Sequence, residues 1–393
     1  MRGMKDSKTM QESPEQPSAQ KASLWKLAGL FLKIGAIAFG GPPAHIAMMD
    51  EEVVSRRSWL TREQFLDFLG ASNLIPGPTS TEMAIYVGRM QAGWPGLVVA
   101  GSCFILPSAV FVAVLAWAYV GYGSLPQLAG VLYGIKPIVI AVIAQAIFKM
   151  ARSAVKSPWL GGLAVLAIVA FALGVNEIVV LAGGGLLAGI AQGLRRKRAS
   201  HSPTAVFLAI GSAATAATPF SLGALFGVFL KIGAVLFGGG YVLVALIRSN
   251  LVARLGWITE RQLLDAIAIG QVTPGPISTA ATFIGYLLAR FPGAAVATIA
   301  MFLPAFFFVV ISGPLIPWLR RSPLAGAVLD GVNVAALALI TVVAGQLFRA
   351  AVVDWPTLLM SAASLWLLLQ FRVNSVWLIL AGALLGSIRI WPH

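Results

Sequence analysis

Residues 31–41 read FLKIGAIAFGG, and residues 229–239 read FLKIGAVLFGG. Nine of these eleven positions are identical, and the second copy begins 198 positions after the first (229 minus 31). The same spacing relates the Pro-Gly-Pro stretch at 76–78 to the one at 274–276. The chain is therefore a duplicated protein in which each repeat occupies about half of the length.

The composition of this duplicated chain is that of a membrane protein. Hydrophobic residues make up 58% of the 393 residues, and charged residues only 11%. Apolar runs close to the ~20 residues that span a bilayer recur along nearly the whole chain. They lack the polar face that a soluble helix shows, and they are too long and too uniform for barrel strands. We therefore expect an all-α polytopic membrane protein.

The net charge of +14 has a topological explanation. In a soluble protein such a charge would suggest nucleic acid. Here the basic residues lie in short loops between apolar runs, which is typical of cytoplasmic loops that face anionic headgroups. We expect membrane lipid and no nucleic acid as a partner, and a homodimer stays open. The single cysteine, Cys103, excludes an internal disulfide.

Polarity divides the chain into four segments. They are a disordered cytoplasmic tail at 1–22, a first transmembrane repeat at 23–194, a basic linker at 195–204 and a second transmembrane repeat at 205–393. The tail is polar and mixed in charge, and the linker opens with four basic residues. The positive charge of the linker favours a position of this segment in the cytoplasm.

The relative orientation of the repeats depends on one extra segment. The apolar piece at 205–218 has no counterpart before the first repeat, and an odd added crossing would invert the second half. The loop charges are divided: Arg248, Arg254 and Arg261 favour parallel halves, whereas Arg320, Arg321 and Arg372 favour inverted ones. We expect inverted repeats, in part because of the family resemblance described below.

Breaks in the helices at matching positions are the strongest functional signal. GGPP at 40–43 corresponds to GGG at 238–240, and each repeat carries one Pro-Gly-Pro stretch. Non-helical backbone at membrane depth is tolerated only where protein buries it or where it lines a cavity. Half-helices that begin after such breaks direct free N–H groups and the positive end of the helix dipole toward one place. The pattern predicts broken helices or re-entrant hairpins that meet at a central anion site.

The candidate binding residues are those of the breaks, the lysines that precede them and the hydroxyl residues at the helix starts. They are Lys33, Gly40, Gly41, Pro76, Gly77, Pro78, Thr79, Ser80, Thr81, Lys231, Gly238, Gly239, Pro274, Gly275, Pro276, Ser278 and Thr279. The hydroxyls could instead cap their helices. The lysines could equally extend to the membrane surface from helices that begin near the interface.

Three further charged residues are candidates for a proton or charge relay. Glu82 follows the first Pro-Gly-Pro stretch, and Ala280 occupies its position in the second repeat. Its carboxylate could carry a proton, or it could pair with Arg89 or Lys33. Arg89 and Arg290 end the helices that follow the Pro-Gly-Pro stretches, where they could simply compensate the helix dipole.

Several catalytic classes lack their motifs. The chain has no phosphate-binding Gly-x4-Gly-Lys-Ser/Thr loop, no His-Glu-x2-His and no histidine cluster. It also shows no obvious nucleophile and base. We therefore expect no enzyme, no catalytic residue, no metal and no cofactor.

These motifs resemble the chromate ion transporter family. The resemblance rests on F-x-K-x-G-x3-F-G-G at both repeats, on W-L-T-x2-Q-F-L-D at 59–67 and on the Pro-Gly-Pro stretches. It covers the chain from about residue 25 to the end, as in a long-chain, two-repeat member. It implies export of chromate across the cytoplasmic membrane of a prokaryote, driven by the membrane potential, the proton gradient or both, with chromate resistance as the phenotype. It also implies halves of opposite orientation, and the N-terminus is expected in the cytoplasm.

Two alternatives remain at this point. A permease or exchanger for sulfate or another oxyanion would use the same fold, because sulfate shares the charge and tetrahedral shape of chromate. A membrane scaffold or a membrane enzyme is the remote alternative, and the paired breaks disfavour it because a scaffold has no use for unwound backbone at membrane depth.

Overall fold

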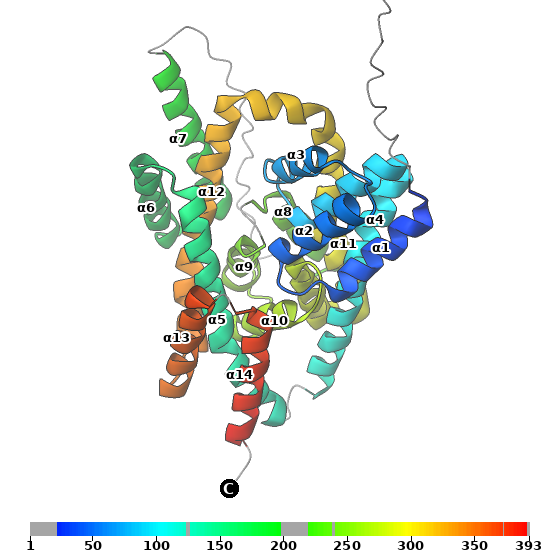
Figure 1. Ribbon diagram of the computed structural model, residues 1–393. Coiled ribbons are helices and arrows are strands. Elements are labelled where there is room, and N and C mark those ends of the chain that lie inside the picture. Colours follow the sequence, from blue (N-terminus) through cyan, green and yellow to red (C-terminus); the bar gives the residue numbers. More distant parts are fainter. Residues whose placement is uncertain (1–21, 123–125, 198–218, 238–239, 372, 391–393) are drawn as a thin grey trace, which may run out of the picture.

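The computed structural model describes residues 22–122, 126–197, 219–237, 240–371 and 373–390 (Figure 1). Residues 1–21 of the expected tail, residues 198–204 of the expected linker and the apolar piece at 205–218 lie outside this description. Gly238 and Gly239 of the candidate site lie outside it as well.

Every regular element in the described residues is a helix. The first repeat contains α1 (Leu24–Ile37), α2 (Pro42–Asp50), the π-helix η1 (Glu51–Arg56), α3 (Arg62–Ser72), α4 (Thr79–Tyr122), α5 (Pro126–Ala154), α6 (Pro158–Ala172) and α7 (Glu177–Lys197). The second contains α8 (Leu222–Ala234), α9 (Val242–Ile247), the π-helix η2 (Arg248–Arg254), α10 (Glu260–Val272), the short 3₁₀ helix η3 (Ile277–Thr279), α11 (Ala280–Arg321), α12 (Pro323–Ala351), α13 (Trp355–Gln370) and α14 (Ser375–Ile390). Five of the described helices are long and apolar enough to cross a membrane. The predicted all-α polytopic fold with two repeats is confirmed.

Local sequence signals explain several of the helix boundaries. Thr61 and Gln64 form a reciprocal capping box at the start of α3, as their spacing predicts. Thr259 and Gln262 form the same box at the start of α10. α2 begins at Pro42, directly after the glycine break, because proline suits the first turn of a helix.

α4 and α11 are helical hairpins. The backbone of α4 leaves helical geometry at Ala92 and Gly93, and the backbone of α11 does so at Ala289 and Arg290. The two arms of α4 are in such close contact that a Cβ atom on Gly88 would overlap the carbonyl oxygen of Gly96. Gly285 and Gly293 make the equivalent contact in α11. In each repeat the helix that follows Pro-Gly-Pro therefore turns back on itself before it crosses the molecule.

The two repeats interlock through their last three helices. α6 and α7 pack against α12 of the other repeat, whereas α13 and α14 pack against α5. α4 also packs against α11, and α5 against α12. In Figure 1, α5 runs from the lower edge of the view upward and α12 from the upper edge downward. The last three helices of each repeat therefore bury much of their surface against the other repeat.

Close backbone contact holds these interlocked helices together. A Cβ atom on Gly134 of α5 would overlap the carbonyl oxygen of Gly382 in α14. In α7, a Cβ atom on Gly184 would lie 2.8 Å from the carbonyl oxygen of Gly331 in α12. Small residues allow such an approach in membranes, where dispersion and weak polar contacts drive helix association.

We expect Gly184→Val to destabilise the protein, because the added side chain forces α7 away from α12. Overpacking of this kind costs about 1–3 kcal/mol. Gly183→Val is the matched control, since nothing lies within 4 Å of a Cβ atom on that neighbouring glycine of the same helix. The measurement is the thermal unfolding midpoint of each variant in detergent. Equal midpoints for the two valine variants would contradict the packing.

Candidate functional site

The helix breaks of the two repeats are hydrogen-bonded to each other. The backbone N–H of Gly77 donates to the carbonyl oxygen of Leu236 at 2.8 Å, and the N–H of Gly275 donates to the carbonyl oxygen of Ala38 at 3.0 Å. Ala38 directly follows the end of α1, and Leu236, its equivalent in the second repeat, lies two residues after the end of α8. Each Pro-Gly-Pro segment therefore binds the unwound segment of the other repeat. These bonds satisfy backbone groups that the broken helices leave free.

A histidine supports one of these crossings. His45 is fully buried in α2, and its Nε2 lies 3.1 Å from the carbonyl oxygen of Ala38, which also accepts from Gly275. Leu243 occupies the His45 position in the second repeat.

A cavity lies beside the break of the first repeat. Its volume is about 420 Å³, and residues of both repeats line it. The lining includes Pro42, Gly77, Thr79, Leu236 and Asn333, and also Lys156 and Asp330, which form an ion pair of 2.7 Å with each other. Gly77 and Thr79 are candidate binding residues, and Leu236 accepts the hydrogen bond from Gly77. A small oxyanion would fit this volume and would meet the start of the α4 half-helix.

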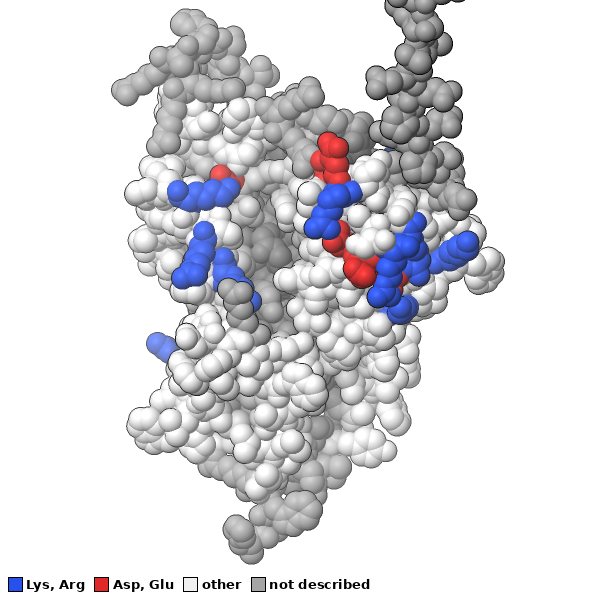
Figure 2. Space-filling view, in the orientation of Figure 1, with Lys and Arg blue, Asp and Glu red and all other residues white. Residues whose placement is uncertain are grey.

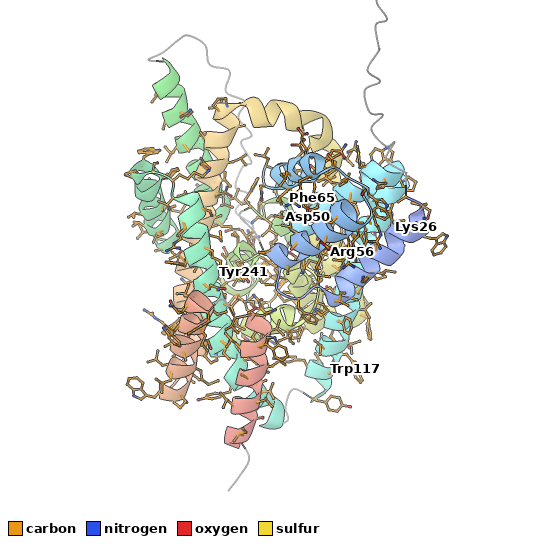
Figure 3. The ribbon with its side chains drawn as sticks, viewed as in Figure 1. Lys26, Asp50, Arg56, Phe65, Trp117 and Tyr241 are labelled. Atoms are coloured by element: carbon orange, nitrogen blue, oxygen red, sulfur yellow. The ribbon has the colours of Figure 1, made fainter. Side chains whose placement is uncertain are left out.

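The space-filling view separates charged and uncharged surface. Figure 2 shows the lysine, arginine, aspartate and glutamate side chains of this face in its upper and middle parts, whereas its lowest described part is uncharged. In Figure 3, Tyr241 lies near the centre of the view, directly after the break of the second repeat. At the first break, Gly40 and Pro43 are exposed, whereas Ala38, directly before it, is buried.

Some of the candidate hydroxyl groups lack hydrogen-bond partners. Thr81 and Ser278 are 0% and 1% exposed, and within the described residues neither side-chain oxygen has a partner. Thr279 differs, since its Oγ1 lies 3.0 Å from Oγ of Ser108 and donates to the carbonyl oxygen of Pro276. Ser80 is buried beside Thr81 in the first turn of α4. Buried polar groups without a partner are rare, and such a group is a natural contact for a ligand.

The two repeated lysines are held in ion pairs. Nζ of Lys33 lies 3.0 Å from Oε1 of Glu52, and the Lys33 side chain is 52% exposed. Nζ of Lys231 lies 2.9 Å from Oε1 of Glu177 and 3.0 Å from Oδ1 of Asn250. An anion that approaches either lysine must therefore compete with a carboxylate.

The acidic partners of the lysines come from different places in the two repeats. Asn250 occupies the position of Glu52 in the second repeat (52 plus 198), so that repeat lacks its own carboxylate there. Glu177 of the first repeat supplies it instead, from the start of α7. Sequence reasoning missed Glu177, because only the interlocking of the repeats places it near Lys231.

We expect Lys231→Met to destabilise the protein more than Lys33→Met. The first change leaves Glu177, whose side chain is 4% exposed, without its cation, which can cost roughly 3 kcal/mol in a buried pair. After the second change, Arg56 and Arg57 still neutralise Glu52. The measurement is the thermal unfolding midpoint, and Lys231→Met/Glu177→Gln should recover most of the loss. A larger loss for Lys33→Met would contradict the assignment.

Glu82 is an isolated buried carboxyl group. It is 0% exposed, and neither of its oxygens has a hydrogen-bond partner within the described residues. A Cβ atom on Gly77 would overlap its Oε1, so the carboxyl group lies against the Pro-Gly-Pro turn. The alternative pairing with Arg89 or Lys33 is not observed. Arg89 instead donates to the carbonyl oxygens of Val309 and Val310, and Lys33 pairs with Glu52.

Arg290 lies in the turn of the α11 hairpin. Its φ angle is 54°, and its Cζ atom lies 6.0 Å from the centroid of the Tyr286 ring. Gly93 occupies the equivalent place in α4. Among the described residues, no group of three histidine, cysteine, aspartate or glutamate side chains is placed to hold a metal ion.

Comparison with known proteins relates both repeats to transporters. A family model described as "Chromate transporter" matches residues 25–190 and again residues 223–387. The chromate transport protein of Cupriavidus metallidurans is 33% identical over 97% of this chain and 98% of its own length. A probable chromate transport protein of Synechococcus elongatus is 32% identical over 87% of this chain and 89% of its own. The chromate transport protein of Pseudomonas aeruginosa is 30% identical over 94% and 92%. No solved structure matches the chain.

Proposed function

The chain belongs to the chromate transporter family, and on this premise we propose that it is a secondary active transporter that exports chromate from the cytoplasm. The observation that carries the proposal is the reciprocal hydrogen bonding between the helix breaks, Gly77 to Leu236 and Gly275 to Ala38. The half-helix start of the first repeat, with Gly77 and Thr79, borders a cavity of about 420 Å³ that Leu236 of the second repeat also lines. Discontinuous helices that meet at a repeat interface form the substrate sites of many transporters.

In this proposal the oxyanion binds at the starts of the half-helices. Backbone N–H groups and the positive ends of the helix dipoles favour a dianion there. The unpartnered hydroxyls of Thr81 and Ser278 support this site, and Thr79 reaches the cavity itself. The remaining candidate residues of the breaks act by holding this geometry. Lys33 and Lys231 contribute positive potential while they stay paired with carboxylates.

The repeats are proposed to have inverted orientations in the cytoplasmic membrane, with the N-terminus in the cytoplasm. The opposite directions of α5 and α12 in Figure 1 support this arrangement. The reciprocal packing of α6 and α7 on α12, and of α13 and α14 on α5, also supports it. Inverted repeats would let the two halves exchange conformations around one site, so that access alternates between the two sides.

The membrane potential suffices to drive export. One charge that moves through 100 mV changes free energy by about 2.3 kcal/mol, so a dianion that leaves a negative interior gains roughly 4.6 kcal/mol. This corresponds to a more than thousandfold concentration ratio at about 1.4 kcal/mol per factor of ten. A coupled proton would add to the gradient, and Glu82 is the proposed proton carrier. Export of this strength would confer chromate resistance on the cell.

The test is uptake of radiolabelled chromate into everted membrane vesicles that contain the protein. Potential and pH gradient are collapsed separately, and sulfate is added as a competitor. We expect chromate uptake that falls when the potential is collapsed. Uptake of sulfate but not of chromate would replace the assignment with a sulfate permease or exchanger of the same fold. Absence of both would overturn the transport proposal.

A further inference from the structure

A buried ion pair joins the two repeats. Nζ of Lys136 in α5 lies 2.9 Å from Oδ1 of Asp265 in α10, and the two side chains are 9% and 1% exposed. The hydroxyl of Tyr119 in α4 donates to Oδ2 of the same aspartate at 2.8 Å. The cluster therefore combines two helices of the first repeat with one helix of the second.

This lysine lies within a membrane-spanning helix. Lys136 belongs to the candidate span Ala129–Ala154, and among the lysine and arginine side chains whose burial the structure describes it is the one that is buried. Charged groups in such a place are costly and usually mark ion or substrate pathways. Stability does not account for the pair, because replacing a buried ion pair with well-packed apolar residues is often neutral or stabilising.

The internal repeat relates Lys136 to the lining of the cavity. Its counterpart in the second repeat is Asn333 (136 plus 197), which borders the cavity together with Gly77 and Thr79. Lys136 of the first repeat therefore corresponds to Asn333 of the second repeat, and Asn333 lines the cavity. Val142, further along α5, belongs to an apolar cluster against which Tyr241 packs. Tyr241 is the N-cap of α9, so this part of α5 lies close to the start of α9.

We propose that Lys136 is the cation that binds the translocated tetrahedral dianion, and that Asp265 is the internal counter-ion which this dianion displaces. The inference rests on the proposed transport function and adds a binding residue to it. Without substrate, Asp265 compensates the charge of Lys136 in a medium of low dielectric constant. When the dianion arrives, it takes over Lys136, while Tyr119 remains a hydrogen-bond donor to the released carboxylate. Lys136 is thereby paired with an anion at every stage, either with Asp265 or with the dianion.

The counter-ion role makes opposite predictions for the two partners. Lys136→Met should raise the Kd for chromate and for sulfate at least about tenfold, because the cation is lost. Asp265→Asn should lower both Kd values about tenfold, because nothing competes with the dianion for Lys136. Asp265→Asn should also slow transport, because the neutral side chain no longer competes with the bound dianion for Lys136 when the dianion is released. Lys136→Arg should retain binding, because it retains the charge.

The double variant Lys136→Met/Asp265→Asn separates the binding role from a structural one, and it removes both buried charges together. The experiment measures chromate and sulfate binding calorimetrically, and thermal unfolding midpoints, on the full chain in detergent. We expect the double variant to unfold near the wild-type temperature and to bind both anions with a Kd raised at least about tenfold. Arg62→Met/Asp50→Asn, which removes an exposed ion pair, is the control and should bind normally.

The two proposals fail in different ways. Wild-type binding by the double variant, or equal losses of affinity in the two single variants, would overturn the counter-ion role and leave the transport proposal intact. A wild-type protein that binds and transports neither chromate nor sulfate would overturn the transport proposal, and the inference with it.

Discussion

Gly275→Ala is expected to reduce chromate transport about tenfold or more, while the protein still inserts into the membrane. Gly275 has a φ angle of 92°, where a side chain costs about 1–3 kcal/mol of strain. A Cβ atom there would also lie 2.7 Å from Cβ of Ser108 and 3.1 Å from the carbonyl oxygen of Gly35. Relief of this contact must move the Pro-Gly-Pro segment, whose N–H binds the carbonyl oxygen of Ala38. The crossing of the breaks would then be lost.

Gly174→Ala is the matched control for this prediction. Gly174 has a nearly identical φ angle of 90°, but nothing lies within 4 Å of an added Cβ atom. The two variants therefore share the backbone strain and differ only in the contact at the site. The measurement is chromate uptake into everted vesicles, normalised to the amount of inserted protein. If both variants transport equally well, the contact between the breaks is not required for function.

Glu82→Gln is expected to abolish the part of chromate transport that depends on the pH gradient and to retain the part that depends on the potential. Glutamine preserves the size of the side chain but cannot bind or release a proton. Glu82 is fully buried, has no hydrogen-bond partner within the described residues and lies against the turn at Gly77. A change in its protonation would therefore act directly on the break that borders the cavity.

The control for this change is Glu63→Gln, which alters an exposed carboxylate in the first turn of α3. It should leave both components of transport unchanged. The assay collapses the pH gradient with an exchanger and the potential with an ionophore, in separate vesicle samples. A Glu82→Gln protein that still responds fully to the pH gradient would exclude Glu82 as the proton carrier.

The sequence alone determined the class of the fold and its duplication. Backbone preferences and hydrophobic patterns act over a few residues, so the apolar runs predicted the helices. For the same reason, the glycines at 40 and 41 predicted a break in the first repeat. The candidate site residues and the inverted orientation remain predictions that the proposed experiments can test.

The tertiary structure decided which of these local features meet. The bond from Gly77 to Leu236 and the pairing of Lys231 with Glu177 join segments that are far apart in sequence, and neither partner carries a local signal for the other. The ion pair of Lys136 with Asp265 likewise crosses from one repeat to the other. The physical reason is that an unpaired charge is costly inside a membrane, and the interlocked helices bring the partners of Lys231 and Lys136 from distant parts of the chain. Duplication predicted two similar halves, whereas packing gave equivalent residues different partners, as with Lys33 and Lys231.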